Sequence, residues 1–195
     1  FEDYDGLHTR IQNRWASASY MHVGNQMGYA ECDAVPATDT ASHWIVERVG
    51  NVLIDFSAQS VLSYGSGQDF GSYSVLDAGK TLHLNGNSWK KIELNYTITA
   101  DTVLEFDYKS TVEGEIQGIG FDANNQAGTT EVFELYGTDD WAIRNYETYS
   151  ENGYQHFVIP IGQHYTGFIR YLTFINDHDG GNQDATGYYS NVRIY

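Results

Sequence analysis

The sequence predicts an all-β protein built around a β-sandwich. Sixteen Tyr, nine Phe and four Trp, together with many Val, Ile and Thr, favour the half-buried surface of a pleated sheet. Leu104, Phe106 and Tyr108 alternate with charged residues, so one face of that segment is expected in the core and the other in water. Twenty Gly, with Asn and Asp, separate short apolar runs at regular spacing, which favours a sandwich over a barrel. We expect almost no helix.

The chain of 195 residues is long enough for one well-cored domain with a small appendage. The pattern of apolar runs and polar turns changes near Val49, so we predict a small lobe over residues 1–51 and a sandwich over residues 52–195. Strands of the sandwich are predicted over 80–84, 89–94, 102–108, 116–121, 130–136, 155–161, 168–175 and 189–195. Four shorter runs, over 10–15, 19–23, 28–31 and 42–47, give the lobe a hairpin pattern.

The lobe has the order of one lectin repeat. It opens on "RIQNRW", continues with "YMHV" and closes on "SHWIVE", in which Trp44 is retained where a Gln-x-Trp motif would stand. Residues 9–49 therefore resemble a single repeat of a ricin-type β-trefoil. A trefoil needs three such lobes, and the chain shows no second copy. The lobe is either truncated, packed on the following domain, or shared among three chains, and nothing in the sequence demands the symmetry of the last arrangement.

The sandwich segment shows a closer resemblance. It contains the runs "LHLNGNSWKKIELNYTITADTVLEFDYKS", "GEIQGIGFD", "FELYGTDDWAI", "FINDHD" and "YYSNVRIY". These runs resemble the jelly-roll carbohydrate-binding modules found at the ends of bacterial polysaccharidases. The resemblance covers residues 53–195. It implies a polysaccharide or oligosaccharide ligand, a catalytic domain of a parent enzyme in cis, and a secreted, extracellular protein. Because the chain begins at Phe1, we expect it to be a piece of a longer precursor.

Charge excludes two classes of partner. Twenty-six acidic against ten basic residues give a formal net charge of −16, which disfavours nucleic acid and anionic membrane surfaces. The acidic excess either keeps the protein soluble in a salty medium or supplies oxygen ligands for Ca²⁺, the cofactor we predict. Cys32 is the single cysteine, so no internal disulfide is possible.

A calcium site is predicted from one acidic loop. Residues 176–184 hold three carboxylates with side-chain amides and two glycines that let the chain bend. Asp177, Asp179 and Asp184 are the predicted metal ligands in this loop, and Asp122, at the end of another predicted strand, is added because the resembling modules often bind calcium at strand ends. The alternative for the loop is an ordinary solvated turn, since its spacing is not that of an EF-hand.

A saccharide site is predicted from aromatic side chains in polar loops. An indole or phenol ring can cover the apolar C–H face of a sugar while polar neighbours bind its hydroxyl groups. Trp141 follows a predicted strand in a Gly- and Asp-rich loop, which favours exposure; its alternative role is to cover the end of the core. The predicted saccharide-binding residues are Trp141, Tyr136, Asp140, Tyr154 and Trp89.

No catalytic residues are predicted. A retaining glycosidase of this architecture needs paired carboxylates, usually as Glu-x-Asp-x-x-Glu, and Ser110 stands where the second Glu would follow Glu105 and Asp107. The simplest interpretation is that Glu105 and Asp107 occupy the solvent-facing positions of an alternating strand. Nor does the sequence contain a His-Glu-x-x-His motif, a Gly-x-Ser-x-Gly elbow or a phosphate loop. The alternatives are a structural or adhesion domain of a surface protein and, less favoured, a small glycosidase or polysaccharide lyase.

Overall fold

A computed structural model describes residues 2–3, 9–10, 19–23, 30–34, 52–65, 67–150, 153–180 and 183–195. The chain divides into two compact units, Phe1–Val49 and Gly50–Tyr195. Among the described ranges, no helix is both long and apolar enough to span a bilayer.

The first unit contains two small antiparallel pairs. Strand β1 (Glu2–Asp3) pairs with β2 (Thr9–Arg10), and β3 (Ser19–Val23) pairs with β4 (Ala30–Ala34). Strand β3 has the bounds expected from the sequence. The closing run over 42–47, with Trp44, lies outside the described residues, so the trefoil resemblance stays a prediction.

The second unit is a β-sandwich, as predicted. Its strands are β5 (Val52–Leu53), β6 (Leu62–Ser63), β7 (Ser72–Leu76), β8 (Thr81–Asn85), β9 (Ser88–Ile98), β10 (Leu104–Val112), β11 (Ile116–Asp122), β12 (Val132–Tyr136), β13 (Gln155–Ile159), β14 (Gly167–Asp177) and β15 (Thr186–Ile194). Short 3₁₀ turns are η2 (Asp77–Gly79), η3 (Arg144–Tyr146) and η4 (Ile161–Gln163).

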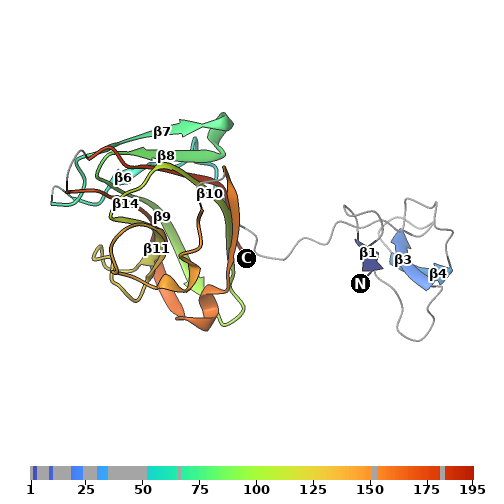
Figure 1. Cartoon of the computed structure of the whole chain (residues 1–195). Coiled ribbons are helices and arrows are strands. Elements are labelled where there is room, and N and C mark those ends of the chain that lie inside the picture. The colour runs from blue at the N-terminus through green and yellow to red at the C-terminus, as the bar shows by residue number, and fades with distance from the viewer. Residues whose placement is uncertain are drawn as a thin grey trace. The chain divides into compact units, whose positions relative to one another are not determined.

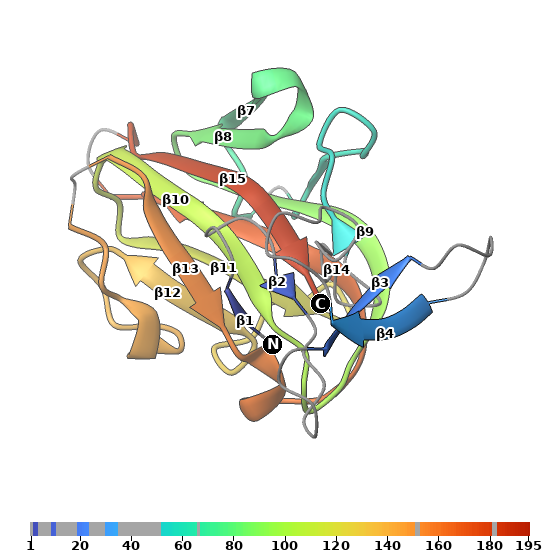
Figure 2. The same ribbon diagram turned by 90° about the vertical axis from the view of Figure 1, so that its right-hand side faces the viewer.

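The strands form two antiparallel layers (Figures 1 and 2). One sheet has the order β13-β10-β15-β8-β7, with β5 also paired to β15, and the other has the order β12-β11-β14-β9-β6. The chain changes sheet between β8 and β9, β9 and β10, and β10 and β11, so neighbours in sequence often lie in opposite layers. This crossing explains why residues far apart in sequence meet at one edge of the sandwich.

The core lies between the two sheets and follows the alternation of each strand. Leu104, Phe106 and Tyr108 of β10 are fully buried, as their spacing predicts. From the opposite layer Phe174 packs edge-on to Tyr189 of β15, with ring centroids 5.2 Å apart. Burial of this apolar surface provides most of the free energy that favours folding.

Three strands were not expected from the sequence. Residues Ser72–Leu76 are all exposed and show no alternation of buried and exposed positions, and β7 forms only because it pairs along its length with β8. Strands β5 and β6 have two residues each, too few for a pattern. The predicted strand 155–161 ends at Ile159 because Pro160 has no N–H for the ladder, and η4 follows.

Candidate functional site

The outer face of the five-stranded sheet carries a second apolar cluster. On β14, Phe174 points into the core, whereas its neighbour Ile175 points outward. The pairing of β14 with β9 sets Ile175 opposite Trp89. The cluster comprises Tyr64, Trp89, Ile116, Val132 and Ile175, and Trp141 and Ala142 pack against it. A loop bearing an indole therefore closes over the side of the sheet that faces away from the core.

A pocket of about 290 Å³ opens beside this cluster. That volume lies just below the range of about 300–1,000 Å³ that is typical of small-ligand sites. Its walls come from residues 67–68, the β8–β9 turn, the start of β11, the 137–143 loop, and the end of β14 with the residues that follow it. The lining residues are Gly67, Gln68, Asn87, Trp89, Ile116, Trp141, Asp177 and Asp179.

Two indoles form the apolar wall. Trp89 is 3% exposed and Trp141 is partly buried. Their rings meet edge to face, with centroids 5.6 Å apart and planes at 75°. The Trp89 Nε1–H donates to Asp177 Oδ1 over 2.8 Å. This bond fixes the rotamer of the buried indole and places a carboxylate at the boundary between the apolar and polar walls.

The polar wall is acidic. Burial raises the pKa of Asp177, the hydrogen bond from Trp89 lowers it, and the carboxylates of Asp179, Glu115 and Asp139 raise it further. The pKa of Glu115 is lowered, chiefly by the backbone N–H of Gly180. Glu115 Oε2 accepts this N–H over 3.1 Å and the N–H of Asp179 over 2.7 Å. The pocket therefore combines aromatic rings with negative charge.

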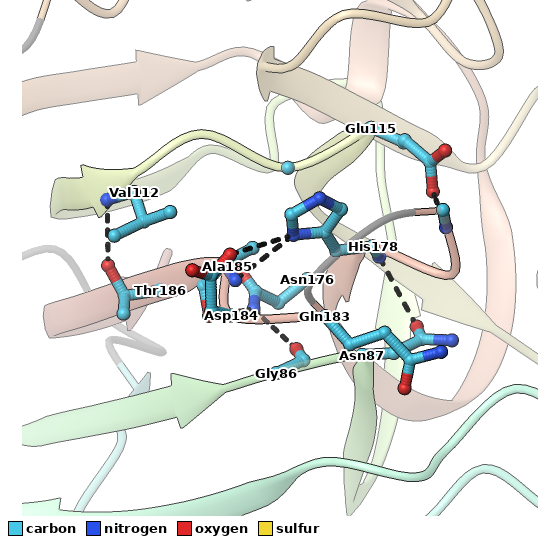
Figure 3. Close-up of polar contacts among 12 residues, drawn as sticks. Gly86, Asn87, Val112, Glu115, Asn176, His178, Gln183, Asp184, Ala185 and Thr186 are labelled. Atoms are coloured by element: carbon cyan, nitrogen blue, oxygen red, sulfur yellow. Dashed lines mark hydrogen bonds and ion pairs between the residues drawn. The ribbon is translucent and has the colours of Figure 1, made fainter.

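Hydrogen bonds hold the acidic loop that follows β14 (Figure 3). The His178 N–H donates to Asn87 Oδ1 over 3.4 Å, and His178 Nδ1 accepts from the Ala185 N–H over 3.2 Å. His178 Nδ1 also lies 3.6 Å from Asp184 Oδ1. Figure 3 shows His178 between Asn87 on one side and Asp184 and Ala185 on the other. The loop is thus tied to the β8–β9 turn, which supplies another wall of the pocket.

Comparisons with known proteins give a likeness of fold. No family model matches the chain, and no curated protein matches it. A solved carbohydrate-binding module of family 29 is 13% identical, with a TM-score of 0.43, over 76% of this chain and 89% of that chain. A family 29 module complexed with cellulohexaose is 12% identical, with a TM-score of 0.43, over 76% of this chain and 92% of that chain.

The glycoside hydrolase domain of Endo-D from Streptococcus pneumoniae is 15% identical, with a TM-score of 0.40, over 70% of this chain and 21% of that chain. At these identities the likeness is one of fold.

The pocket joins residues that the sequence assigned to two different sites. Trp141 and Trp89 were predicted to contact saccharide, and Asp177 and Asp179 were predicted to bind calcium, yet all four line one cavity. The pairing of Ile116 with Asp177 and of Ile175 with Trp89 brings them together. Such register depends on contacts between strands distant in sequence, so spacing along the chain could not reveal it.

The other predicted saccharide residues lie outside this pocket. The Tyr136 ring packs on Tyr149 with centroids 5.2 Å apart, and Tyr136 contacts the core. Asp140 forms an ion pair with Arg144. Tyr154 is 48% exposed, and its ring lies 5.3 Å from the Lys109 ammonium on the other sheet.

The predicted calcium ligands do not all converge. Asp122 ends β11 and is the register partner of Tyr171 on β14. Ile116 begins β11 and is the register partner of Asp177, so the two aspartates lie at opposite ends of this strand pair. Its carboxylate accepts hydrogen bonds from the Tyr64 hydroxyl and from the N–H groups of Asn124 and Asn125, over 2.7 and 2.9 Å for the last two. Within the described ranges, no group of three or more His, Cys, Asp or Glu is arranged to hold a metal ion. Calcium stays a prediction from the sequence.

A larger cavity, of about 370 Å³, lies beside β5 and η2. None of its described lining residues is aromatic, and its Asp55 carboxylate already accepts hydrogen bonds from the Ser57 N–H and hydroxyl over 2.9 and 2.6 Å. Its lining residues are Leu53, Ile54, Asp55, Ala78, Gly79, Lys80, Asn191 and Arg193. The smaller pocket carries more recognisable chemistry, because rings and oxygen acceptors face one space.

Glu134 holds the loop that bears Trp141, a role that the sequence did not indicate. The side chain is fully buried. Its Oε2 accepts the N–H groups of Trp141 and Ala142 over 3.3 and 3.1 Å, and its Oε1 has no hydrogen-bond partner within the described part of the chain. Its own N–H donates to Ile143 O over 2.9 Å, and the Ile143 N–H donates to Val132 O over 3.0 Å. The loop is therefore anchored to β12 at Glu134 and at Val132.

Replacing Glu134 with glutamine is expected to change the pH dependence of stability. Burial raises the pKa of Glu134, the two backbone N–H groups lower it, and Glu147 and Arg144 act in opposite directions. A carboxyl with a raised pKa binds its proton more tightly in the folded state. Protonation therefore stabilises the fold, fully at pH values below the unfolded pKa and no longer at pH values above the folded pKa.

The wild type should consequently gain stability relative to Glu134→Gln as the pH falls from neutral toward the ordinary glutamate pKa of 4.5. Glutamine keeps an acceptor for the two N–H groups, so the comparison isolates the charge. Urea unfolding of both proteins at a series of pH values measures the difference. Parallel stability curves would contradict this assignment.

Proposed function

We propose that the second unit is a non-catalytic saccharide-binding module whose site is the pocket between Trp89 and Trp141. The observation that carries the proposal is the lining itself: two indoles face the same cavity as the carboxylates of Asp177 and Asp179 and the amides of Asn87 and Gln68. Indole surfaces suit the C–H faces of a sugar ring, and carboxylate and amide groups suit its hydroxyl groups.

The described pocket favours binding over cleavage. Its described lining residues include two carboxylates but no His, Lys, Arg, Cys or Ser side chain that could serve as a partner in nucleophilic catalysis. Asp177 is held by Trp89 through the hydrogen bond already described. On the outer face of β10, Glu105 accepts from the Tyr195 hydroxyl over 2.7 Å and Asp107 accepts from the Asn191 amide over 2.7 Å. Both acids are therefore bound by side chains at the C-terminal end of the chain.

The module is further proposed to tether a polysaccharide-degrading catalytic domain in cis, in an extracellular setting. Weak binding by a single pocket is strengthened when a linked domain acts on the same polymer, because the second encounter becomes intramolecular.

A glycan array probed with the full chain tests the proposal. We expect binding to at least one class of saccharide, with no release of reducing ends when the same ligands are incubated with the protein. Running the array with EDTA and with added Ca²⁺ tests the calcium prediction separately. Release of shortened oligosaccharides, or the absence of binding to every glycan, would overturn the proposed function.

A further inference from the structure

The described lining of the pocket carries negative charge. Among its described lining residues Asp177 and Asp179 are charged, and none is Lys, Arg or His. Three basic side chains nearby have partners of their own. His178 Nδ1 accepts from the Ala185 N–H and lies 3.6 Å from Asp184 Oδ1. Lys90 forms an ion pair with Asp69 at 2.6 Å, and Arg144 pairs with Asp140 and with Glu147. A cationic group entering the pocket would meet uncompensated carboxylates.

Asp177 keeps one oxygen for such a group. Its Oδ1 accepts from Trp89 Nε1, and no described residue donates to its Oδ2. The carboxylates of Asp179, Glu115 and Asp139 lie close enough to disfavour its negative charge. A bound cation would relieve that repulsion and would gain a charge-assisted hydrogen bond. A neutral hydroxyl would gain less from the same oxygen.

The two indoles favour the same kind of ligand. An ammonium group is attracted to the face of an indole through the ring quadrupole. The edge-to-face arrangement of Trp89 and Trp141, with planes at 75°, leaves the two rings in different orientations around one cavity. An aromatic wall beside a carboxylate therefore matches a ligand that has both an apolar ring face and an ammonium. The formal net charge of −16 would also draw a polycation toward the surface.

We infer that the pocket selects a saccharide built of amino sugars with free, protonated amines, its ammonium group bound by Asp177 and its ring covered by the indole of Trp141. This inference rests on the proposed saccharide-binding function and names the ligand class of the same site. It differs from the neutral polysaccharide that a stacking site alone would suggest.

Three oligosaccharides of equal length and linkage test the inference: chito-oligosaccharide with free amines, its N-acetylated form, and cello-oligosaccharide. Isothermal titration calorimetry with the full chain is done at a pH where the sugar amine is protonated. We expect the free-amine ligand to bind at least about tenfold more tightly than the other two, the effect of one charge-assisted hydrogen bond. Added salt should weaken this ligand alone, because its advantage is electrostatic.

Asp177→Asn should remove about tenfold of that preference, because the negative charge is lost while the amide oxygen can still accept from Trp89. Asp101→Asn is the matched control. Asp101 is exposed in the β9–β10 turn, and the substitution changes the net charge equally. Near-ultraviolet circular dichroism checks that both variants are folded. If Asp101→Asn lowers the preference as much as Asp177→Asn, long-range charge explains it and the inference fails.

The other outcomes distinguish a failure of the amino-sugar inference from a failure of the proposed saccharide-binding function. Equal affinity for all three oligosaccharides overturns the amino-sugar inference and leaves saccharide binding intact. Loss of free-amine binding in EDTA, with recovery in Ca²⁺, also overturns it, since recognition would then pass through a metal ion. Binding to none of the three ligands, combined with an empty glycan array, overturns the proposed function together with the inference.

Discussion

Replacing Trp141 with alanine is expected to weaken saccharide binding about a hundredfold. Truncating a central aromatic residue in a binding site costs on the order of 2 to 4 kcal/mol, and about 1.4 kcal/mol corresponds to a factor of ten. Trp141 forms one wall of the pocket and packs on Trp89. The fold should survive, because Glu134 contacts the backbone N–H groups of Trp141 and Ala142, which the substitution retains.

Calorimetric titration with a ligand identified on the array measures the loss. Phe168→Ala is the control, since Phe168 is 58% exposed on β14 and does not line the pocket. The control should bind like the wild type. A loss smaller than about threefold for Trp141→Ala would show that the indole is not a principal contact and would move the site elsewhere on the sandwich.

Replacing Asn176 with alanine is expected to destabilise the protein by about 3 kcal/mol, because buried polar groups would lose their partners. Asn176 is fully buried at the end of β14. Its Nδ2 donates to Gly86 O over 2.8 Å and to Ala185 O over 3.0 Å, and its Oδ1 accepts from Gln117 Nε2 over 2.6 Å. The link from Asn176 to Gly86 is visible in Figure 3.

Urea unfolding followed by tryptophan fluorescence measures this change, and the melting temperature should fall by roughly 6 to 12 °C. Asn145→Ala is the control, because Asn145 is exposed in η3, and surface substitutions away from special features usually change stability by less than about 0.5 kcal/mol. A similar small effect for Asn176→Ala would mean that water replaces the lost amide and that the network does not hold the loops together.

The predicted buried and exposed faces of the strands are confirmed where apolar and polar residues alternate regularly. Leu104, Phe106 and Tyr108 are buried as their alternation requires, and β11 and β14 lie within two residues of the predicted bounds. Local sequence is sufficient in these cases, because the side chains of a strand alternate between its two faces whatever the strand pairs with. Strand β7 has no such pattern and was missed, since only its pairing with β8 defines it.

The sequence by itself determined the all-β class, the faces of the long strands and the residue types of the candidate site, including Trp89, Trp141, Asp177 and Asp179. Tertiary structure alone decided that these four share one pocket, that Asp122 lies at the other end of β11, and that Glu134 anchors the loop of Trp141. The physical reason is that alternation is a property of a single strand, whereas register and sheet order come from hydrogen bonds and packing between strands distant in sequence.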